Sequence, residues 1–207
     1  MQPMLILASQ SPRRKELLSQ LGYKFKTLAA NIDETVIEGE LPAQYVLRLA
    51  KEKAQFIAEQ QSEDCIVLGS DTSVVLNQDI LGKPENIEQC CQQLMLLSNN
   101  THQVLTAIAA VKNQQIVSAL ITTDVTFKSL TIDEIKRYWQ TGEPQDKAGA
   151  YGIQGIGGQF VTQINGSYSA VVGLPLYETA KLLAELDLPT PIQATNTPNN
   201  VKHGETL

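Results

Sequence analysis

MLILASQSPRRKELLSQLG, residues 4–22, places an apolar run, a short polar loop and a helical pattern one after another. Met4–Ala8 is a run typical of a buried strand. Pro12 suits the first position of a helix, because its missing N–H would be unpaired there, and Ser11 is a suitable N-cap. Gly22 can end the helix in the left-handed conformation. The opening unit is therefore strand, short loop, helix.

Further along the chain, helical and strand-like patterns alternate. Helices are predicted over residues 42–60, from residue 85 or 86, over 131–142 and from Pro175. Strands are predicted over residues 65–68, 73–76, 104–111 and 116–127. Two more, 160–164 and 168–172, flank Asn165-Gly166 and predict a hairpin. Strands that alternate with helices, together with antiparallel hairpins, indicate an α/β fold with a mixed sheet.

The composition suits one medium α/β domain, or two closely joined lobes around a cleft. The 207 residues include 22 acidic and 16 basic ones, which gives a formal net charge of −6. A general nucleic-acid binder usually has a basic excess, so that class is disfavoured. We expect a single domain over residues 1–188 and a disordered tail rich in Pro, Thr and Asn over residues 189–207.

The sequence also carries signals about the compartment. The cysteines are odd in number and two are adjacent, Cys90 and Cys91, so a disulfide framework is not expected. The first apolar run is too short for a signal peptide, and no run approaches the roughly 20 residues that span a bilayer. We expect a cytoplasmic protein without a membrane or nucleic-acid partner; its oligomeric state stays open, a homodimer included.

The polar loop between the first strand and the first helix is a candidate anion site. Unpaired backbone N–H groups and the helix dipole favour an anion at a helix N-terminus. Ser9 and Ser11 add hydroxyls, and the guanidiniums of Arg13 and Arg14 can each grip two phosphate oxygens. The alternative is an N-cap followed by solvated basic residues. The loop is not a Walker motif, because the glycines and the final GK[ST] are missing.

Acidic and basic side chains elsewhere form a second group of candidates. Asp71 and Thr72 follow an apolar run, and a carboxylate at the end of a buried strand can be a base or a metal ligand. Asp71 could instead stabilise a tight turn. Glu34, in an Asp-Glu pair, can bind magnesium beside phosphates. Lys53 and Lys83 can neutralise a leaving group. The alternatives are a solvated loop at Glu34, an ordinary helix-surface lysine at Lys53 and a turn at Lys83.

A glycine-rich segment, residues 145–159, comes late in the chain. Its small residues allow a ligand to approach the backbone closely. Gln154 is the polar side chain in this segment that can read a nucleobase, since it offers both a donor and an acceptor. Taken alone, such a segment need not bind anything.

Six short motifs follow one another between about Met4 and Leu186: Ser-x-Ser-x-Arg-Arg, Asp-Glu, Lys-Glu-Lys-Ala, Gly-x-Asp-Thr, Gly-Lys-Pro and Asp-Lys-Ala-Gly-Ala-Tyr-Gly-Ile-Gln-Gly. In this combination the chain resembles the Maf-like nucleotide pyrophosphatases, and the last motif resembles the branch that acts on dTTP and UTP. The resemblance implies an ITPase-like α/β fold with an elongated, mixed sheet flanked by helices. It also implies hydrolysis of nucleoside triphosphates to the monophosphate and pyrophosphate with a divalent metal, Mg²⁺ or Mn²⁺.

The resemblance further implies roles for single residues. Asp71 is the expected proton acceptor, and Glu34 with Asp71 is the expected metal-binding pair. The positions expected to set substrate specificity are Arg13, Thr72 and Gln154. The positions expected to hold phosphate and substrate are Ser9, Arg14, Lys53 and Lys83, together with Ser11 of the same loop.

Two other functions stay open at this point. One is a broader house-cleaning pyrophosphatase that prefers damaged or modified pyrimidine nucleotides. The other is a regulator of cell division that binds a nucleotide as a signal without catalysis. An assay of pyrophosphate release over a panel of nucleotides separates the three.

Overall fold

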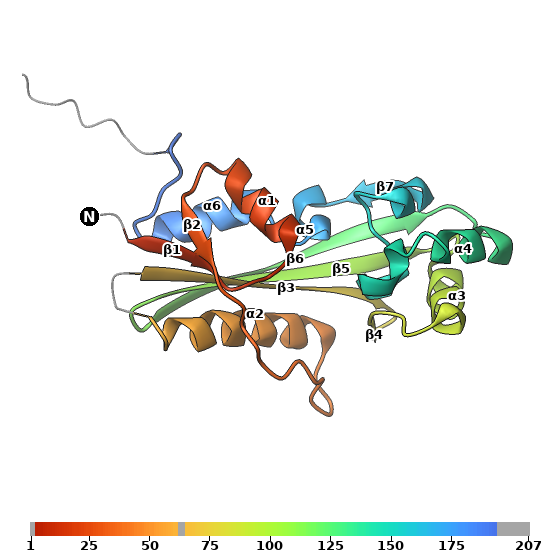
Figure 1. Ribbon diagram of the computed structural model, residues 1–207, viewed down its shortest axis with the longest axis horizontal. Helices are drawn as coiled ribbons and strands as arrows, with labels where there is room; N and C mark the ends of the chain where they lie inside the picture. Colours follow the sequence, from red (N-terminus) through yellow and green to blue (C-terminus); the bar gives the residue numbers. More distant parts are fainter. Residues whose placement is uncertain (1–2, 62–64, 194–207) are drawn as a thin grey trace, which may run out of the picture.

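The computed structural model describes residues 3–61 and 65–193. This part of the chain forms a seven-stranded sheet in the order β2-β1-β3-β5-β6-β7, with β4 paired to β3. Figure 1 shows an elongated molecule whose long strands run along its length. The mixed α/β sheet flanked by helices that the sequence predicts is therefore confirmed.

The first elements form the predicted strand, loop and helix. β1 (Met4–Leu7) leads through the polar loop into α1 (Pro12–Gln20), and the short strand β2 (Phe25–Thr27) follows. Ser11 is the N-cap of α1, and its hydroxyl accepts a hydrogen bond from the Arg14 N–H. Gly22, just after the helix, has a φ of +78°. β1 lies parallel to both β2 and β3 (Cys65–Leu76).

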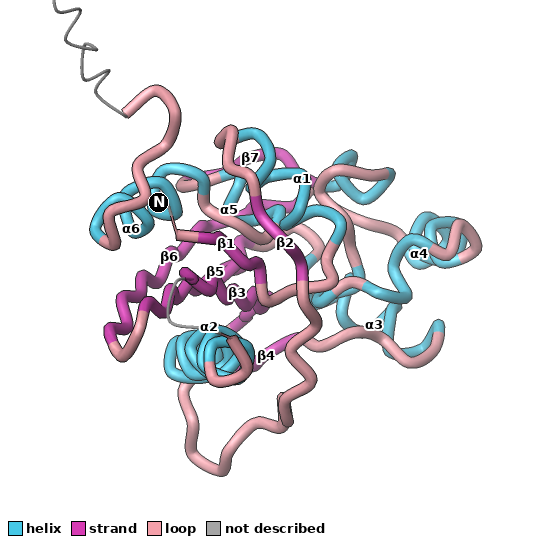
Figure 2. Tube along the Cα trace, turned by 60° about the vertical axis from the view of Figure 1, so that its left-hand side comes forward, coloured by secondary structure: helices cyan, strands magenta, loops and turns pink. Residues whose placement is uncertain are grey.

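The centre of the sheet consists of three long antiparallel neighbours, β3, β5 (Thr101–Lys112) and β6 (Gln115–Phe127). As Figures 1 and 2 show, α2 (Pro42–Ala58) covers one face. The opposite face is covered by α1, α5 (Tyr168–Val172) and α6 (Leu176–Glu185). Buried aliphatic side chains fill both layers, so the sheet is a rigid platform.

A second group of elements packs around one end of the long strands (Figure 1). It comprises β4 (Asp79–Leu81), α3 (Ile87–Leu97), α4 (Ile132–Trp139), β7 (Val161–Asn165) and the 3₁₀ helices η1 (Glu143–Asp146), η2 (Ala148–Ala150) and η3 (Ile156–Phe160). The aromatic rings of its core belong to Phe127, Tyr138, Tyr151 and Phe160. The 3₁₀ helices contain the glycine-rich segment, which therefore packs on this aromatic core.

Residues 69–72 were predicted to separate two strands, but they belong to the continuous strand β3. They pair with residues 106–109 of β5. Gly69 is needed for packing rather than for a turn, because a Cβ there would lie 2.3 Å from the Ala50 carbonyl oxygen of α2. The predicted strands are too short because the local sequence pattern does not show that α2 packs against residue 69. That packing, and not a turn, requires glycine there.

The hairpin predicted around Asn165-Gly166 is also wrong. Its first strand exists as β7, but β7 pairs with β6. The second predicted strand, 168–172, is the helix α5. The Ser167 hydroxyl accepts a hydrogen bond of 3.2 Å from the Ala170 N–H, so it caps that helix. A capping serine directly after the glycine therefore favours a helix over a returning strand.

The end of the described chain packs on the sheet's helical layer. Leu188 and Thr190 are buried, so the first residues of the predicted tail, 189–207, have defined contacts. The rest of that tail, 194–207, lies outside the described residues. In the part of the chain that is described, no helix has the length and apolar character needed to cross a membrane.

The aromatic core contains a buried histidine, His102, which is 1% exposed. Its Nε2 lies 2.8 Å from the Tyr151 hydroxyl. Its Nδ1 has no hydrogen-bond partner among the residues that the structure describes. Burial lowers the pKa of His102 from its ordinary 6.5 to about 4, since the charged ring would lose its hydration. The folded protein therefore holds this ring neutral at mildly acidic pH.

The stability of the protein should depend on this histidine below pH 6.5. The folded-state pKa lies below the unfolded one, so the unfolded chain takes up the proton first as the pH falls. The stabilisation is complete above pH 6.5, and about 3 kcal/mol of it should be lost by pH 4. Urea denaturation across this range should show that His102→Gln removes most of this loss. Parallel curves for wild type and variant would contradict the prediction.

Candidate active site

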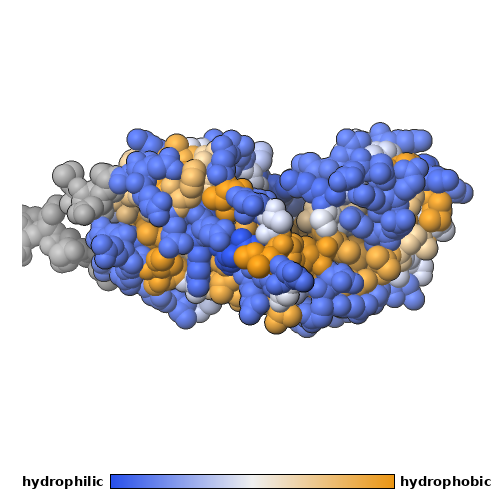
Figure 3. Space-filling model, turned by 90° about the horizontal axis from the view of Figure 1, so that it is seen from below, coloured by the Kyte–Doolittle hydropathy of each residue, from blue (hydrophilic) through white to orange (hydrophobic). Residues whose placement is uncertain are grey.

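A cavity of about 930 Å³ is lined by residues from both groups of elements. Figure 3 shows the molecule indented between its two ends. The structure brings all ten of the predicted site residues to this one cavity: Ser9, Ser11, Arg13, Arg14, Glu34, Lys53, Asp71, Thr72, Lys83 and Gln154. The sequence motifs that carry them are therefore parts of one site, while the role of each residue stays a prediction.

The site forms where β3 continues beyond β1. The last residues that pair these strands are Leu7 and Leu68, whereas β3 runs on to Leu76. The polar loop after β1 therefore lies against an edge of β3 that β1 leaves uncovered. Asp71 and Thr72 belong to this stretch, and successive strand residues point to opposite faces. Asp71 accordingly faces α2, and Thr72 faces α1.

A lysine between two carboxylates occupies the α2 side of the site. The Lys53 Nζ lies 2.6 Å from Glu34 Oε1 and 2.7 Å from Asp71 Oδ1. Lys53 and Asp71 are each 7% exposed, so the alternative that Lys53 is an ordinary lysine on a helix surface is wrong. Burial raises the pKa of Asp71, while the positive charges of Lys53 and Arg14 act against this rise.

A fixed guanidinium occupies the α1 side. Arg14 donates from Nε to the Gly173 carbonyl oxygen over 2.9 Å and from Nη2 to the Thr72 hydroxyl over 3.2 Å. The Thr106 hydroxyl donates to the Ala170 carbonyl oxygen, so the Thr72 hydroxyl must donate to Thr106, 3.0 Å away. These contacts hold Arg14 at one position, and the Thr72 hydroxyl proton is already used in a hydrogen bond within the protein.

Two further cations line the cavity without ion pairs. Within residues 3–61 and 65–193, neither Arg13 nor Lys83 forms a salt bridge. Lys83 is exposed and Arg13 half-buried. Their charges are therefore available to an anionic ligand. So is the charge of Arg14, because its hydrogen-bond acceptors are uncharged oxygens, whereas Lys53 is ion-paired with Glu34 and Asp71. The cavity can thus bind phosphate although the whole chain is acidic.

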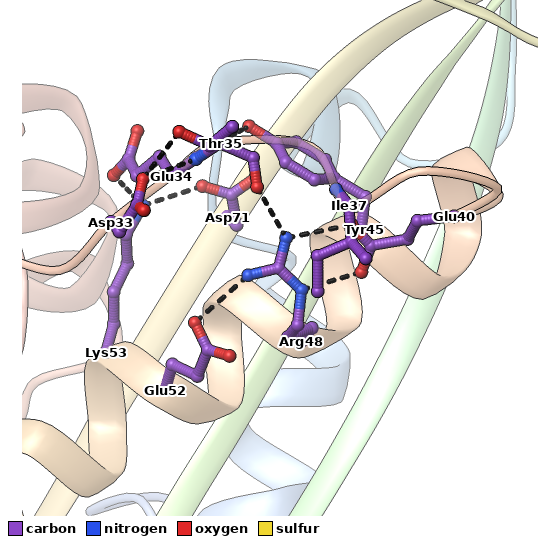
Figure 4. A network of polar contacts seen from close by, with 10 residues as sticks. All are labelled: Asp33, Glu34, Thr35, Ile37, Glu40, Tyr45, Arg48, Glu52, Lys53 and Asp71. Carbon is purple, nitrogen blue, oxygen red and sulfur yellow. Dashed lines mark hydrogen bonds and ion pairs between the residues drawn. The ribbon is translucent and has the colours of Figure 1, made fainter.

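The loop that carries Glu34 is held against α2 by one arginine, as Figure 4 shows. Arg48 donates to both oxygens of Glu40, over 2.6 and 2.8 Å, and to the Thr35 carbonyl oxygen over 3.1 Å. The Tyr45 hydroxyl donates to the Glu34 carbonyl oxygen over 2.9 Å. These bonds fix the backbone at Glu34 and directly after it, which helps its carboxylate to reach Lys53.

The opposite wall of the cavity comes from the glycine-rich segment. Gln154 is exposed there and borders the cavity. Three charged residues that the prediction did not select also line it: Glu143, Asp146 and Lys147. Asp146 and Lys147 form an ion pair with each other. Asp146 and Lys147 stand in the last motif quoted above, and Glu143 comes just before it. Their position in or next to this motif is the sequence signal that could have identified them.

The residues present are compatible with a divalent cation. No group of three or more His, Cys, Asp or Glu side chains in the described chain is arranged to hold a metal. Two carboxylates do converge, because Glu34 and Asp71 both contact the Lys53 ammonium. Mg²⁺ is commonly held by one or two carboxylates together with substrate phosphates. Glu34 and Asp71 therefore fit a metal that arrives with a nucleotide.

The fold and the site define an α/β protein with a cation-lined cavity of about 930 Å³ around a buried carboxylate. The chain belongs to the Maf-like protein family, which matches residues 4–186. The family expected from the six motifs is therefore confirmed.

Several relatives are similar over most of the chain. A dTTP/UTP pyrophosphatase of Colwellia psychrerythraea (strain 34H / ATCC BAA-681) is 65% identical over 184 residues, which cover 87% of each chain. One of Pseudoalteromonas atlantica (strain T6c / ATCC BAA-1087) is 57% identical over 89% of this chain and 98% of its own. Among solved structures, the Staphylococcus aureus Ham1 protein is 13% identical with a TM-score of 0.40, covering 60% of this chain and 71% of that one, a likeness too weak to carry an argument.

Proposed function

We propose that this protein hydrolyses dTTP and UTP to the nucleoside monophosphate and pyrophosphate. The observation that carries the proposal is the convergence of residues far apart in the sequence on one cavity around the buried Asp71. Membership of the Maf-like family supports it. So do the relatives, which are named dTTP/UTP pyrophosphatase and are 53–65% identical.

In this proposal Asp71 is the general base. It takes a proton from a water molecule, whose oxygen forms a bond to the α-phosphorus while the bond from that phosphorus to the α–β bridging oxygen breaks. The raised pKa makes Asp71 a stronger base than an exposed aspartate, and burial is the cause. The Lys53 ammonium, 2.7 Å away, fixes the orientation of the carboxylate.

The cationic side chains bind the triphosphate and stabilise the departing pyrophosphate. Arg14 is preorganised by its bonds to Gly173 and Thr72, so little conformational entropy is lost when it meets a phosphate. Arg13 and Lys83 supply charges that have no salt-bridge partner in the described structure. Preorganised donors of this kind are typically the largest contribution to stabilising charge in a transition state.

A divalent cation, Mg²⁺ or Mn²⁺, belongs to the proposal and would be held by Glu34 and Asp71. When bound, such an ion polarises phosphoryl oxygens and neutralises their charge. The Lys53 ammonium now lies between both carboxylates, so it keeps them close together before a cation arrives.

Base selection is assigned to the glycine-rich wall. Thymine and uracil present an N3–H donor between two carbonyl acceptors, whereas cytosine and the purines present other patterns. The Gln154 amide can match one donor and acceptor edge of the first pattern. A polar group left unpaired by the wrong base costs about 1–3 kcal/mol, which is roughly 5- to 160-fold in rate. With Arg13 and Thr72, Gln154 completes the proposed specificity set.

Product analysis over a nucleotide panel tests the proposed function. With Mg²⁺ or Mn²⁺, dTTP and UTP should each yield the monophosphate and pyrophosphate, and CTP and the purine triphosphates should react at least about tenfold more slowly. A preference for modified pyrimidine nucleotides would instead favour a broader house-cleaning enzyme. Binding without turnover would favour a regulator. Formation of a nucleoside diphosphate and orthophosphate would contradict cleavage between the α and β phosphates.

The proposed location is the cytoplasm. The cysteines are odd in number and two of them, Cys90 and Cys91, are adjacent, a pattern that does not suggest a disulfide framework and is compatible with a reducing compartment. A homodimer remains a proposal that sedimentation velocity of the purified protein can test.

A further inference from the structure

The Glu143 carboxylate, at the start of η1, is surrounded by hydrogen-bond donors from the glycine-rich segment. Its Oε1 accepts from the Tyr138 hydroxyl over 2.7 Å and from the Gly157 N–H over 2.9 Å. Its Oε2 accepts from the Ile156 N–H over 2.8 Å. The carboxylate therefore binds the backbone of the segment directly after Gln154.

The tyrosine extends this attachment to the other side of Gln154. The Tyr138 hydroxyl also accepts a hydrogen bond of 3.2 Å from the Gly152 N–H. Its ring is buried and packs edge-on against Phe160, with the centroids 5.0 Å apart. Gly152 and Ile156 are thus both tied to one rigid anchor, and Gln154 lies midway between them on the cavity wall.

The glycines of this segment show how closely it wraps the carboxylate. A Cβ at Gly155 would lie 2.3 Å from Glu143 Oε2. A Cβ at Gly157 would lie 2.5 Å from the Tyr138 hydroxyl oxygen. The backbone can reach these acceptors only because both positions lack a side chain.

Glu143 is ionised in this setting. Burial raises the pKa of Glu143, but the hydrogen bonds from Gly157, Tyr138 and Ile156 outweigh it, so its pKa lies below the usual value. A negative oxygen accepts from N–H and O–H groups more strongly than a neutral one. The negative charge of Glu143 therefore strengthens its hydrogen bonds to the loop backbone.

We propose that Glu143 is a positioning residue for nucleotide selection: it fixes the segment 152–157 and thereby sets where the Gln154 amide meets the base. The proposal rests on the proposed function, because it assigns Gln154 a base to read. It differs from a catalytic role, since Glu143 would act through Gln154 and not on the reacting phosphates.

Selectivity kinetics of Glu143→Gln tests this proposal. The amide has one acceptor oxygen, and its NH₂ group would face an N–H or O–H donor, so the loop contacts cannot all survive. The ratio of kcat/KM for UTP to that for CTP should fall at least about tenfold, mainly through KM for UTP, while kcat for UTP changes less than about threefold. Glu59→Gln, an exposed glutamate at the end of α2, is the matched control and should keep the wild-type ratio.

A double-mutant cycle separates positioning from general damage. If Glu143 acts through Gln154, adding Glu143→Gln to Gln154→Ala should lower the ratio no further. Additive losses, an unchanged ratio in Glu143→Gln, or equal losses for UTP and CTP would each overturn the proposal. Should Glu143→Gln fold poorly by its melting curve, Tyr138→Phe replaces it, since it removes the hydroxyl that joins Glu143 to Gly152 and should shift the ratio in the same direction.

Calorimetric binding of the α,β-methylene analogues of UTP and CTP distinguishes a failure of the proposed function from a failure of the positioning role. Wild type that prefers the UTP analogue but releases no pyrophosphate from UTP would refute the proposed function, and loss of that preference in Glu143→Gln would still support positioning. Wild type that hydrolyses UTP selectively, with an unchanged preference in Glu143→Gln, would refute positioning alone. Wild type with no preference would overturn the positioning role as well.

Discussion

Asp71→Asn is expected to lower kcat by about 10²–10⁴-fold while nucleotide binding survives. Asparagine keeps the size of the side chain but removes the negative charge and nearly all of the basicity. Arg13, Arg14 and Lys83 still line the cavity, so the triphosphate keeps its cationic partners. Lys53 keeps Glu34 as a counter-ion at 2.6 Å, which limits the loss of stability.

Steady-state kinetics at two metal concentrations, alongside a melting curve, separate the possible roles of Asp71. A general base predicts a low kcat at both concentrations. A residue that mainly holds the metal predicts that high Mn²⁺ restores part of the rate. The turn-stabilising role that the sequence left open is already contradicted, because Asp71 lies inside β3 and pairs with Ala107. Near-normal turnover in Asp71→Asn would refute the proposed mechanism.

Gly69→Ala is expected to lower both stability and activity. The new Cβ would lie 2.3 Å from the Ala50 carbonyl oxygen and 2.9 Å from the Ala54 N, so α2 would have to move away from β3. We expect a loss of about 3 kcal/mol, at the upper end of typical overpacking costs, and a Tm lower by roughly 6–12 °C. Lys53 lies between Ala50 and Ala54 on α2, so its ammonium should leave Asp71 and kcat/KM should fall at least about tenfold.

Gly82→Ala is the matched control for this substitution. A Cβ at Gly82 would meet nothing within 4 Å, and the residue is exposed. Thermal melts and UTP kinetics of the two variants should therefore differ clearly. A Gly69→Ala protein with the Tm and rate of the control would show that α2 and β3 are not tightly coupled.

Local sequence signals predicted the elements whose ends are marked by a single residue. Pro12 after Ser11 located the start of α1, and Asn86 caps α3 as one of the two predicted starts. The motifs also identified residues that line one cavity, because the polar side chains of the site lie within these short motifs. Such signals lie within a few residues of the structure that they specify.

The features that could not be predicted depend on contacts between distant segments. The motif around Lys53 did not exclude an ordinary surface lysine, because a helical pattern does not show that two carboxylates, Glu34 and Asp71, will meet its ammonium. The glycine at 69 suggested a turn, since the sequence does not show α2 crossing above it. Glu143 was missed because two of its three donors are backbone N–H groups, those of residues 156 and 157, which every sequence contains.

Hydrolysis of UTP in water enriched in oxygen-18 tests the central claim most directly. The claim is that water activated by Asp71 attacks the α-phosphorus, so the oxygen from water must become part of the nucleoside monophosphate. Mass spectrometry of the products should find one heavy oxygen in UMP and none in the pyrophosphate released in the same reaction. Label in pyrophosphate, with unlabelled UMP, would place the attack on the β-phosphorus and contradict the account.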